Sequence, residues 1–377
     1  MFMFRQRLFT LVFIALIAYP DCGNAEKTSK KHHLNQASNQ STQSSSTKAP
    51  SKLPELGARP YGQRPEVMAQ AADIAERRSL PPDWTADMLG QARHLPSVAR
   101  LMLPAPRGQK KDWGVYRGRF IDPIRIGAGL KFWRTNAALL ARAEQVYGVS
   151  PEIVVGIIGV ETIYGRQTGS FRVMDALATL AFDFPAGHPR AAARQAFFRD
   201  ELEQFLSLMH RSGGEPFSVR GSYAGAIGMP QFMPSSIAKH AVDFDDDGKI
   251  DLTNSVADVI GSVANYFKAY GWTSGVPTHF EVQFDASTLD LDALLAPDIL
   301  PTFSALSIEK LGARLTEAGK AYPGKLALIE LQMGAQPAQY VVGTDNFYTI
   351  TRYNWSSYYA MAVIELGQAV AKEVRRE

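Results

Sequence analysis

One carboxylate follows a long uncharged stretch, and its surroundings make it a candidate for proton transfer. Residues 153–160 contain only Ile, Val and Gly, and Glu161 comes directly after them. A helix that is apolar on every side is buried, and burial raises the pKa of a carboxyl group towards the range of a general acid. The alternative is a glutamate at a helix end that pairs with Arg166 or faces solvent.

A second candidate is the segment 221–236, with the sequence GSYAGAIGMPQFMPSS. Its small residues allow the backbone to approach another backbone or a polymer ligand closely. Ser222 and Gln231 would offer hydrogen-bonding side chains among apolar neighbours. The alternative is a tight structural turn that leads into a helix capped by Ser235 or Ser236.

A third feature is an acidic loop whose spacing matches the first half of a calcium-binding loop. Carboxylates stand at positions 1, 3, 5 and 9, with glycine at position 6: Asp243, Asp245, Asp247, Asp251 and Gly248. Position 12 is Asn254 in place of the usual glutamate, so Asp258 would close the site if the loop is longer. We expect a structural cation site here, and an acidic turn without a cation is the alternative.

These candidates need helices to position them. Ser150 as N-cap and Pro151 at the first helical position would start the helix that carries Glu161. Short strands are expected at 279–284 and 340–342. The apolar spacing predicts helices over 65–77, 84–103, 134–147, 151–165, 173–182, 194–211, 256–270 and 356–374. The sequence thus predicts a mainly α chain with a small β-containing insert before its last helix.

Several common catalytic motifs are absent. The sequence has no GxSxG, no P-loop and no HExxH, and its seven histidines show no metal-ligand spacing. Gly127 and Gly129 lack the third glycine of a dinucleotide loop, so we expect an ordinary turn there. Tyrosines beside polar residues suit either sugar stacking or an amphipathic core: Tyr116, Tyr164, Tyr266, Tyr353 and Tyr359.

The 377-residue chain carries a formal net charge of +3, and its basic excess lies at the N-terminus. Residues 1–25 carry +1 and residues 26–54 carry +4, so residues 55–377, with 33 basic and 35 acidic side chains, carry −2. A near-neutral folded part does not suit a nucleic-acid backbone, so we expect no nucleic-acid partner.

The first 54 residues are predicted to contain a signal and a tether. Residues 1–25 resemble a cleaved secretory signal, and residues 26–54 hold ten Ser or Thr and no aromatic side chain, which is typical of disorder. Cys22, the only cysteine, follows Tyr19, Pro20 and Asp21, which do not suit lipid attachment. We therefore expect a periplasmic protein without disulfides. An outer-membrane lipoprotein anchored through Cys22 is the disfavoured alternative.

Taken together, the motifs resemble the lytic transglycosylase B family of bacterial cell-wall enzymes. The resemblance covers nearly everything from residue 60 to the C-terminus. It rests on VGIIGVET at 155–162 with YGR at 164–166, DALATL at 175–180, the segment 221–236, AVDF at 241–244, GSVANYF at 261–267, and NFY at 346–348 with TRYN at 351–354.

The resemblance implies a lysozyme-like catalytic core, an α-helical domain and a small β-containing insert. It also implies that Glu161 alone serves as acid and then base. The enzyme implied by this resemblance would cleave the bond between N-acetylmuramic acid and N-acetylglucosamine in peptidoglycan and leave a 1,6-anhydro end. The expected divisions after the tether are 55–148 (N-terminal helical domain), 149–275 (catalytic core with the EF-hand-like loop), 276–345 (small β-containing domain) and 346–377 (C-terminal segment).

Matching the motifs residue by residue implies further site residues. The substrate-binding positions are Ser222, Gln231, Tyr116, Tyr266, Tyr353, Asn354, Tyr359 and Arg194. The calcium ligands are Asp243, Asp245, Asp247, the Lys249 carbonyl and Asp258. The family has an arginine pair where only Arg194 aligns here. We expect structural Ca²⁺, no organic cofactor, peptidoglycan strands as partner and a monomer.

Two other functions stay open at this point. One is a true muramidase, which would hydrolyse the same bond, although no second carboxylate of the kind a hydrolase needs stands out in the sequence. The other is a non-catalytic scaffold that binds peptidoglycan and is stabilised by a cation.

Overall fold

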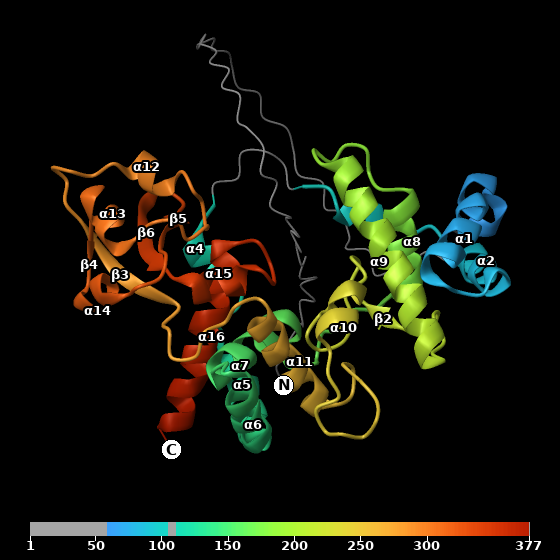
Figure 1. Cartoon of the computed structure of the whole chain (residues 1–377), viewed down its shortest axis with the longest axis horizontal. Helices are drawn as coiled ribbons and strands as arrows, with labels where there is room; N and C mark the ends of the chain where they lie inside the picture. The colour runs from blue at the N-terminus through green and yellow to red at the C-terminus, as the bar shows by residue number, and fades with distance from the viewer. Residues whose placement is uncertain (1–58, 105–110, 377) are drawn as a thin grey trace, which may run out of the picture.

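The computed structural model describes residues 59–104 and 111–376. The predicted signal at 1–25 and the whole of the predicted tether at 26–54 lie outside these described residues. Within the described part, three hydrophobic clusters organise the chain. Figure 1 shows the corresponding groups of helices and strands side by side.

The largest cluster lies in a central helical body. Its core contains α7, whose ten residues from Ile153 to Thr162 are all buried, as the run of Ile, Val and Gly predicts. The body consists of α4 (Trp113–Arg117), α5 (Pro123–Thr135), α6 (Ala137–Tyr147), α7 (Pro151–Thr162), α11 (Val256–Ala269), α15 (Asp345–Thr351) and α16 (Ser357–Arg375).

Two glycines let α7 and α16 cross with their backbones in contact. A Cβ on Gly156 would lie 2.2 Å from the Val363 carbonyl oxygen, and a Cβ on Gly367 would lie 2.0 Å from the Glu152 carbonyl oxygen. No side chain fits at either distance. The helix that carries Glu161 and the last long helix of the chain are therefore held at a spacing that only glycine permits.

A second cluster forms an outer helical body from two separate stretches of the chain. In Figure 1 the blue helices α1 and α2 lie beside α8 and α9. The body consists of η1 (Tyr61–Gln63), α1 (Pro65–Arg78), α2 (Pro82–Gln91), α3 (Pro96–Leu101), α8 (Val173–Phe182) and α9 (Ala191–Ser212). The short helix α10 (Pro234–His240) packs between α9 and α11.

The third cluster lies in a four-stranded antiparallel sheet with strand order β4-β3-β6-β5. Alternate residues of β5 face opposite sides: Ile329 and Leu331 join the central helical body, and Leu328 joins the core of the sheet. The elements are β3 (His279–Phe284), α12 (Leu291–Leu295), α13 (Ala305–Lys310), β4 (Ala313–Leu315), α14 (Glu317–Ala321), β5 (Ala327–Met333) and β6 (Gln336–Gly343). Two further short strands, β1 (Phe171–Arg172) and β2 (Arg220–Gly221), pair with each other.

The mainly α architecture with a small β part is confirmed, and three local predictions are wrong. The predicted helix at 84–103 is two helices, because Leu95 precedes Pro96 and is extended, and the Leu95 N–H bonds to Thr179 Oγ1 at 2.9 Å. The stretch around Gly127 and Gly129 is the middle of α5, not a turn. A Cβ on Gly129 would lie 2.4 Å from the Tyr164 hydroxyl, so the glycine accommodates that ring.

The third wrong prediction concerns the start of α10. Its N-cap is Met233 and its first residue is Pro234, so neither Ser235 nor Ser236 caps it. Among the described helices, none combines the length and hydropathy that a membrane span requires.

Candidate active site

Glu161 lies in the last turn of α7 and is 8% exposed. Burial raises the pKa of its carboxyl group to about 7, and a hydrogen bond from Tyr359 opposes part of this rise. The Tyr359 hydroxyl donates to Glu161 Oε1 at 2.5 Å. Among the described residues Glu161 makes no ion pair, so the alternative of pairing with Arg166 is wrong. A carboxyl group with a pKa near neutrality can both give and take a proton.

Tyr359 lies in the first turn of α16, which begins two residues earlier at Ser357. Ser356 is the N-cap of α16, and its hydroxyl accepts the Tyr359 N–H at 3.3 Å. The glycine crossing of α7 and α16 then sets the distance between the two helices. Both members of the pair thus lie on helices that are packed backbone to backbone.

The end of α7 is tied to the segment 221–236. Thr162 Oγ1 donates to the Met229 carbonyl at 2.8 Å and accepts the Gly165 N–H at 3.0 Å. The next residues, Ile163 and Tyr164, have φ of 52° and 55°, a left-handed conformation that β-branched and bulky residues rarely adopt. This turn ends α7 at Thr162, one residue after Glu161, and keeps the carboxyl group at a helix end.

Ser222 and Gln231 hold the segment 221–236 in its turn while lining a cavity. Ser222 Oγ accepts the backbone N–H groups of Ala224 and Ala226 at 3.3 and 3.0 Å, which leaves its own hydrogen free to donate. Gln231 Nε2 donates to the carbonyls of Thr168 and Gly228 at 3.0 and 2.9 Å. The turn and the ligand-binding interpretations are therefore compatible.

An aromatic cluster closes another side of the cavity. Tyr353 lies nearly parallel to Tyr359, with ring centroids 6.4 Å apart, and its hydroxyl donates to the Pro230 carbonyl. The Tyr266 hydroxyl donates to the Arg352 carbonyl at 2.7 Å. Asn354 Oδ1 is buried and has no donor among the described residues, so it can accept a hydrogen bond from a ligand.

The cavity brings most of the predicted site residues together. It encloses about 1190 Å³, part of it open to solvent. The predicted residues on its lining are Glu161, Ser222, Gln231, Tyr266, Tyr353 and Asn354. Tyr359 is not on the lining, but its hydroxyl donates to Glu161.

Three predicted substrate-binding residues are not on the cavity lining: Tyr359, Tyr116 and Arg194. Tyr116 packs with Trp113 and Tyr358, and burial, together with the charge of Glu161, raises the pKa of its hydroxyl. Arg194 is buried on α9, with its guanidinium 5.7 Å from the Phe198 ring centroid, and it interacts electrostatically with Tyr223 on the lining.

Sequence reasoning missed several residues that line the cavity. One is a second carboxyl group, Glu201 on α9, which is 2% exposed. Both its oxygens are engaged by Ser235, whose N–H donates to Oε2 at 2.8 Å and whose hydroxyl donates to Oε1 at 2.6 Å. Glu201 therefore anchors α10 on α9. Other lining residues that were not predicted include Phe197, Lys239, His240, Tyr270, Arg352 and Trp355.

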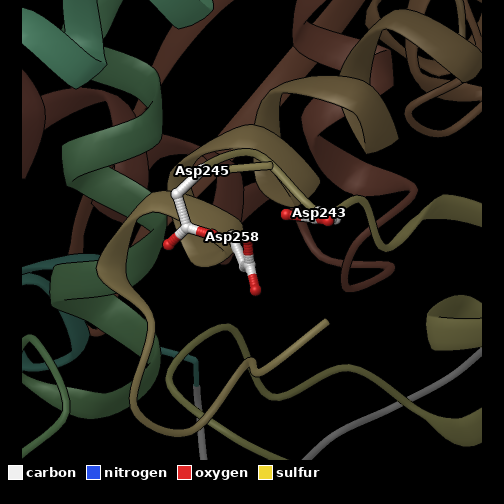
Figure 2. Close-up of side chains that lie close together, drawn as sticks. All are labelled: Asp243, Asp245 and Asp258. Atoms are coloured by element: carbon white, nitrogen blue, oxygen red, sulfur yellow. The ribbon is translucent and has the colours of Figure 1, made fainter. Parts of the chain in front are cut away.

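The acidic loop brings two of its carboxylates close to a third on the first turn of α11. Oxygens of Asp243, Asp245 and Asp258 lie within 4.8 Å of one another, and Figure 2 shows the three side chains side by side. Gly248, at loop position 6, has a φ of 87°, the turn that a calcium loop requires there. This donor set of hard oxygens fits a calcium ion.

The other two predicted ligands, Asp247 and the Lys249 carbonyl, are not part of this group of three carboxylates. The Asp247 side chain accepts the Lys249 N–H at 2.8 Å and so braces the loop backbone. Asp258 accepts the N–H groups of Phe244 and Asp251 at 2.8 and 2.7 Å, which ties both ends of the loop to α11.

Comparisons with known proteins agree with this geometry. Residues 63–368 match the family model described as the transglycosylase SLT domain. Over 306 residues the chain is 42% identical to membrane-bound lytic murein transglycosylase B of Escherichia coli (strain K12), covering 76% of this chain and 77% of that protein.

Solved structures are similar over comparable lengths. The soluble lytic transglycosylase SltB1 from Pseudomonas aeruginosa has a TM-score of 0.74 at 40% identity, covering 83% of this chain and 100% of that one. The Escherichia coli lytic transglycosylase Slt35, in complex with calcium, has a TM-score of 0.73 at 39% identity, covering 84% of this chain and 95% of that one.

A more distant structure contains sugar ligands. SltB3 from Pseudomonas aeruginosa, in complex with NAG-anhNAM-pentapeptide, has a TM-score of 0.65 at 26% identity and covers 81% of this chain and 80% of that one.

Proposed function

The chain belongs to the transglycosylase SLT domain family, and on this premise we propose that it cleaves peptidoglycan glycan strands without water, with Glu161 as both acid and base. One observation carries the proposal: among the described residues that line the cavity, Glu161 is the one carboxyl group with an oxygen that accepts no hydrogen bond. Glu161 uses one oxygen to accept from Tyr359, whereas Ser235 occupies both oxygens of Glu201. A hydrolase of this kind would need a second available carboxylate.

In the proposed reaction, protonated Glu161 gives its proton to the glycosidic oxygen between N-acetylmuramic acid and N-acetylglucosamine. The bond from the muramyl C1 to that oxygen breaks, and the N-acetylglucosamine leaves with a new hydroxyl group. The muramyl C6 hydroxyl oxygen then bonds to C1 and gives its proton to the Glu161 carboxylate. The carboxyl group is restored, no water is consumed, and the new end is a 1,6-anhydro sugar.

Digestion of purified sacculi tests this proposal. Mass spectrometry should find muropeptide ends that are lighter by one water than hydrolysis products and that resist borohydride reduction. Reducible muramic-acid ends would overturn the proposal in favour of a muramidase. Intact sacculi under all conditions would favour a peptidoglycan-binding scaffold.

The pH dependence tests the role of Tyr359. Its hydroxyl donates to the Glu161 carboxylate, which favours the ionised form and holds the pKa below the value that burial alone would give. In Tyr359→Phe we expect the alkaline limb of kcat/KM, near pH 7 in the wild type, to move up by about one pH unit.

Tyr340→Phe is the matched control, because it removes a hydrogen bond from a tyrosine to Glu330 on the sheet. Its pH profile should coincide with that of the wild type. An alkaline limb that stays in place or moves to lower pH in Tyr359→Phe would contradict the assigned role.

We propose in addition that the acidic loop holds a structural Ca²⁺ through Asp243, Asp245 and Asp258. When bound, the ion would neutralise the three crowded carboxylates and fix the loop to the start of α11. Calcium should therefore raise the melting temperature of the wild type, because only the folded chain brings these oxygens together.

Asp245→Asn should lose most of that calcium-dependent rise in differential scanning calorimetry. Asp246→Asn serves as control, since Asp246 lies in the same loop at a φ of 62°, which asparagine tolerates, and outside the carboxylate group. A wild-type melting temperature that calcium leaves unchanged would refute the site.

Export to the periplasm, the absence of a lipid anchor and the monomeric state stay predictions.

A further inference from the structure

Thr162 directly follows the proposed acid in the sequence, and it is 0% exposed. Its hydroxyl makes two hydrogen bonds at once, because it donates to the Met229 carbonyl at 2.8 Å and accepts the Gly165 N–H at 3.0 Å. The first bond reaches the segment 221–236, and the second closes the turn that ends α7. One buried side chain thus joins the stretch that carries Glu161 to the stretch that carries the predicted substrate-binding residues.

The backbone of Met229 is held from both sides. Its N–H donates to the Leu252 carbonyl at 2.8 Å, and its carbonyl accepts the Thr162 hydroxyl. The next carbonyl along the chain accepts the Tyr353 hydroxyl. Gln231 then follows with a φ of 53°, a left-handed conformation that costs free energy in any residue except glycine. Such a conformation persists only where the surrounding structure holds it, and the bond from Thr162 is part of that structure.

The side chain of Gln231 has a fixed orientation as well. Nε2 donates both of its hydrogens to backbone carbonyls, those of Thr168 and Gly228, at 3.0 and 2.9 Å. Among the described residues none donates to Oε1, so this oxygen can accept a hydrogen bond from a ligand in the cavity. Thr168 comes directly after the turn that the Thr162 hydroxyl closes. Thr162 therefore supports the Gln231 amide through α7 and through the segment 221–236.

We infer that Thr162 is a positioning residue for the proposed reaction, because its hydroxyl sets the distance between the Glu161 carboxyl group and the Gln231 amide oxygen. This inference rests on the proposed function. Thr162 does not line the cavity, so it acts only through the two groups that do. Proton transfer to a bound sugar depends on such placement, and an error of about 1 Å can cost about a hundredfold in rate.

Thr162→Val tests the inference, because valine keeps the shape of the side chain and lacks the hydroxyl. We expect kcat on soluble glycan strands to fall about ten- to a hundredfold. Thr162→Ser keeps the hydroxyl and should restore most of the wild-type rate. Should valine prevent folding, Thr162→Ala removes the same hydroxyl without placing a methyl group against the Met229 carbonyl, and it should show the same loss.

Thr179→Val is the matched control. Thr179 is also 0% exposed, and its hydroxyl has the same pattern of bonds in the outer helical body: it donates to the Asp175 carbonyl at 2.8 Å and accepts the Leu95 N–H at 2.9 Å. Both valine variants should unfold at lower urea concentrations than the wild type, because each loses a buried pair of hydrogen bonds. At a temperature at which both are folded by circular dichroism, only Thr162→Val should have a lowered kcat.

A double-mutant cycle with Gln231→Ala separates positioning from stability. Removal of the Gln231 amide should lower kcat/KM in the wild-type background and by much less in Thr162→Val, where the amide is already displaced. Equal losses in the two backgrounds, a wild-type kcat in Thr162→Val, or an equal fall of kcat in Thr179→Val would each overturn the inference. Glycan strands left uncut by the wild type would instead refute the proposed function.

Discussion

Glu161→Gln should lower kcat/KM on peptidoglycan by at least about a thousandfold, because in the proposed mechanism this one side chain supplies both proton transfers. Glutamine keeps the shape of the side chain and can accept from Tyr359, but it has no proton to give to the glycosidic oxygen. The measurement is the release of soluble muropeptides from sacculi. A variant that solubilises sacculi at the wild-type rate would refute the mechanism.

The stability of the same variant separates lost chemistry from a lost fold. Burial raises the pKa of Glu161 from 4.5 to about 7, so between these values the folded chain holds a proton that the unfolded chain has released. Stability from this group therefore falls as the pH rises through that window. Glutamine has no such dependence, so at about pH 8 the melting temperature of the variant should be at least that of the wild type.

Gly367→Ala should destabilise the protein by about 2 to 3 kcal/mol and also remove most of its activity. The added Cβ would lie 2.0 Å from the Glu152 carbonyl oxygen, and backbone cannot rotate away as a side chain can. The only relief is for α16 to move off α7. That movement separates the Tyr359 hydroxyl from Glu161, whose distance is 2.5 Å. Urea unfolding and muropeptide release measure the two effects.

Gly127→Ala offers a matched control for the helix crossing. Gly127 lies inside α5, and a Cβ there meets nothing within 4 Å. Alanine also favours a helix over glycine, by about 1 kcal/mol, so this variant should be as stable as the wild type or more so. If Gly367→Ala unfolded at the wild-type urea concentration, the close crossing of the two helices would be wrong.

The sequence predicted the features that depend on neighbours along the chain. A run of Ile, Val and Gly before Glu161 is enough to indicate a buried helix, and the structure has that helix at Pro151–Thr162. The acidic loop is equally local, since its spacing alone brings Asp243 and Asp245 near each other. The prediction of a turn at Gly127 and Gly129 was wrong because a tertiary contact explains Gly129. The Tyr164 ring packs where a side chain on Gly129 would lie.

The rest of the cavity depends on contacts between distant segments. Glu201 gave no signal in the sequence, because its acceptor role depends on Ser235, 34 residues further on. Lys239 and Arg352 look like ordinary surface residues until α10 and the end of α15 are placed around Tyr270. Whether an acidic or basic residue lines the cavity depends on how distant segments pack, and neighbours along the sequence do not reveal this.

Because α7 packs against α16, the surroundings of Glu161 can form only after α16 has been synthesised. Glu161 and Tyr359 are 198 residues apart, and the first 359 of the 377 residues must be made before they can meet. A nascent or C-terminally clipped chain carries the acid residue but has neither its hydroxyl partner nor the helix that buries it. Closing so long a loop is also a late and slow step of folding. Under the proposed mechanism, the chain is therefore expected to lack activity on peptidoglycan until α16 has docked.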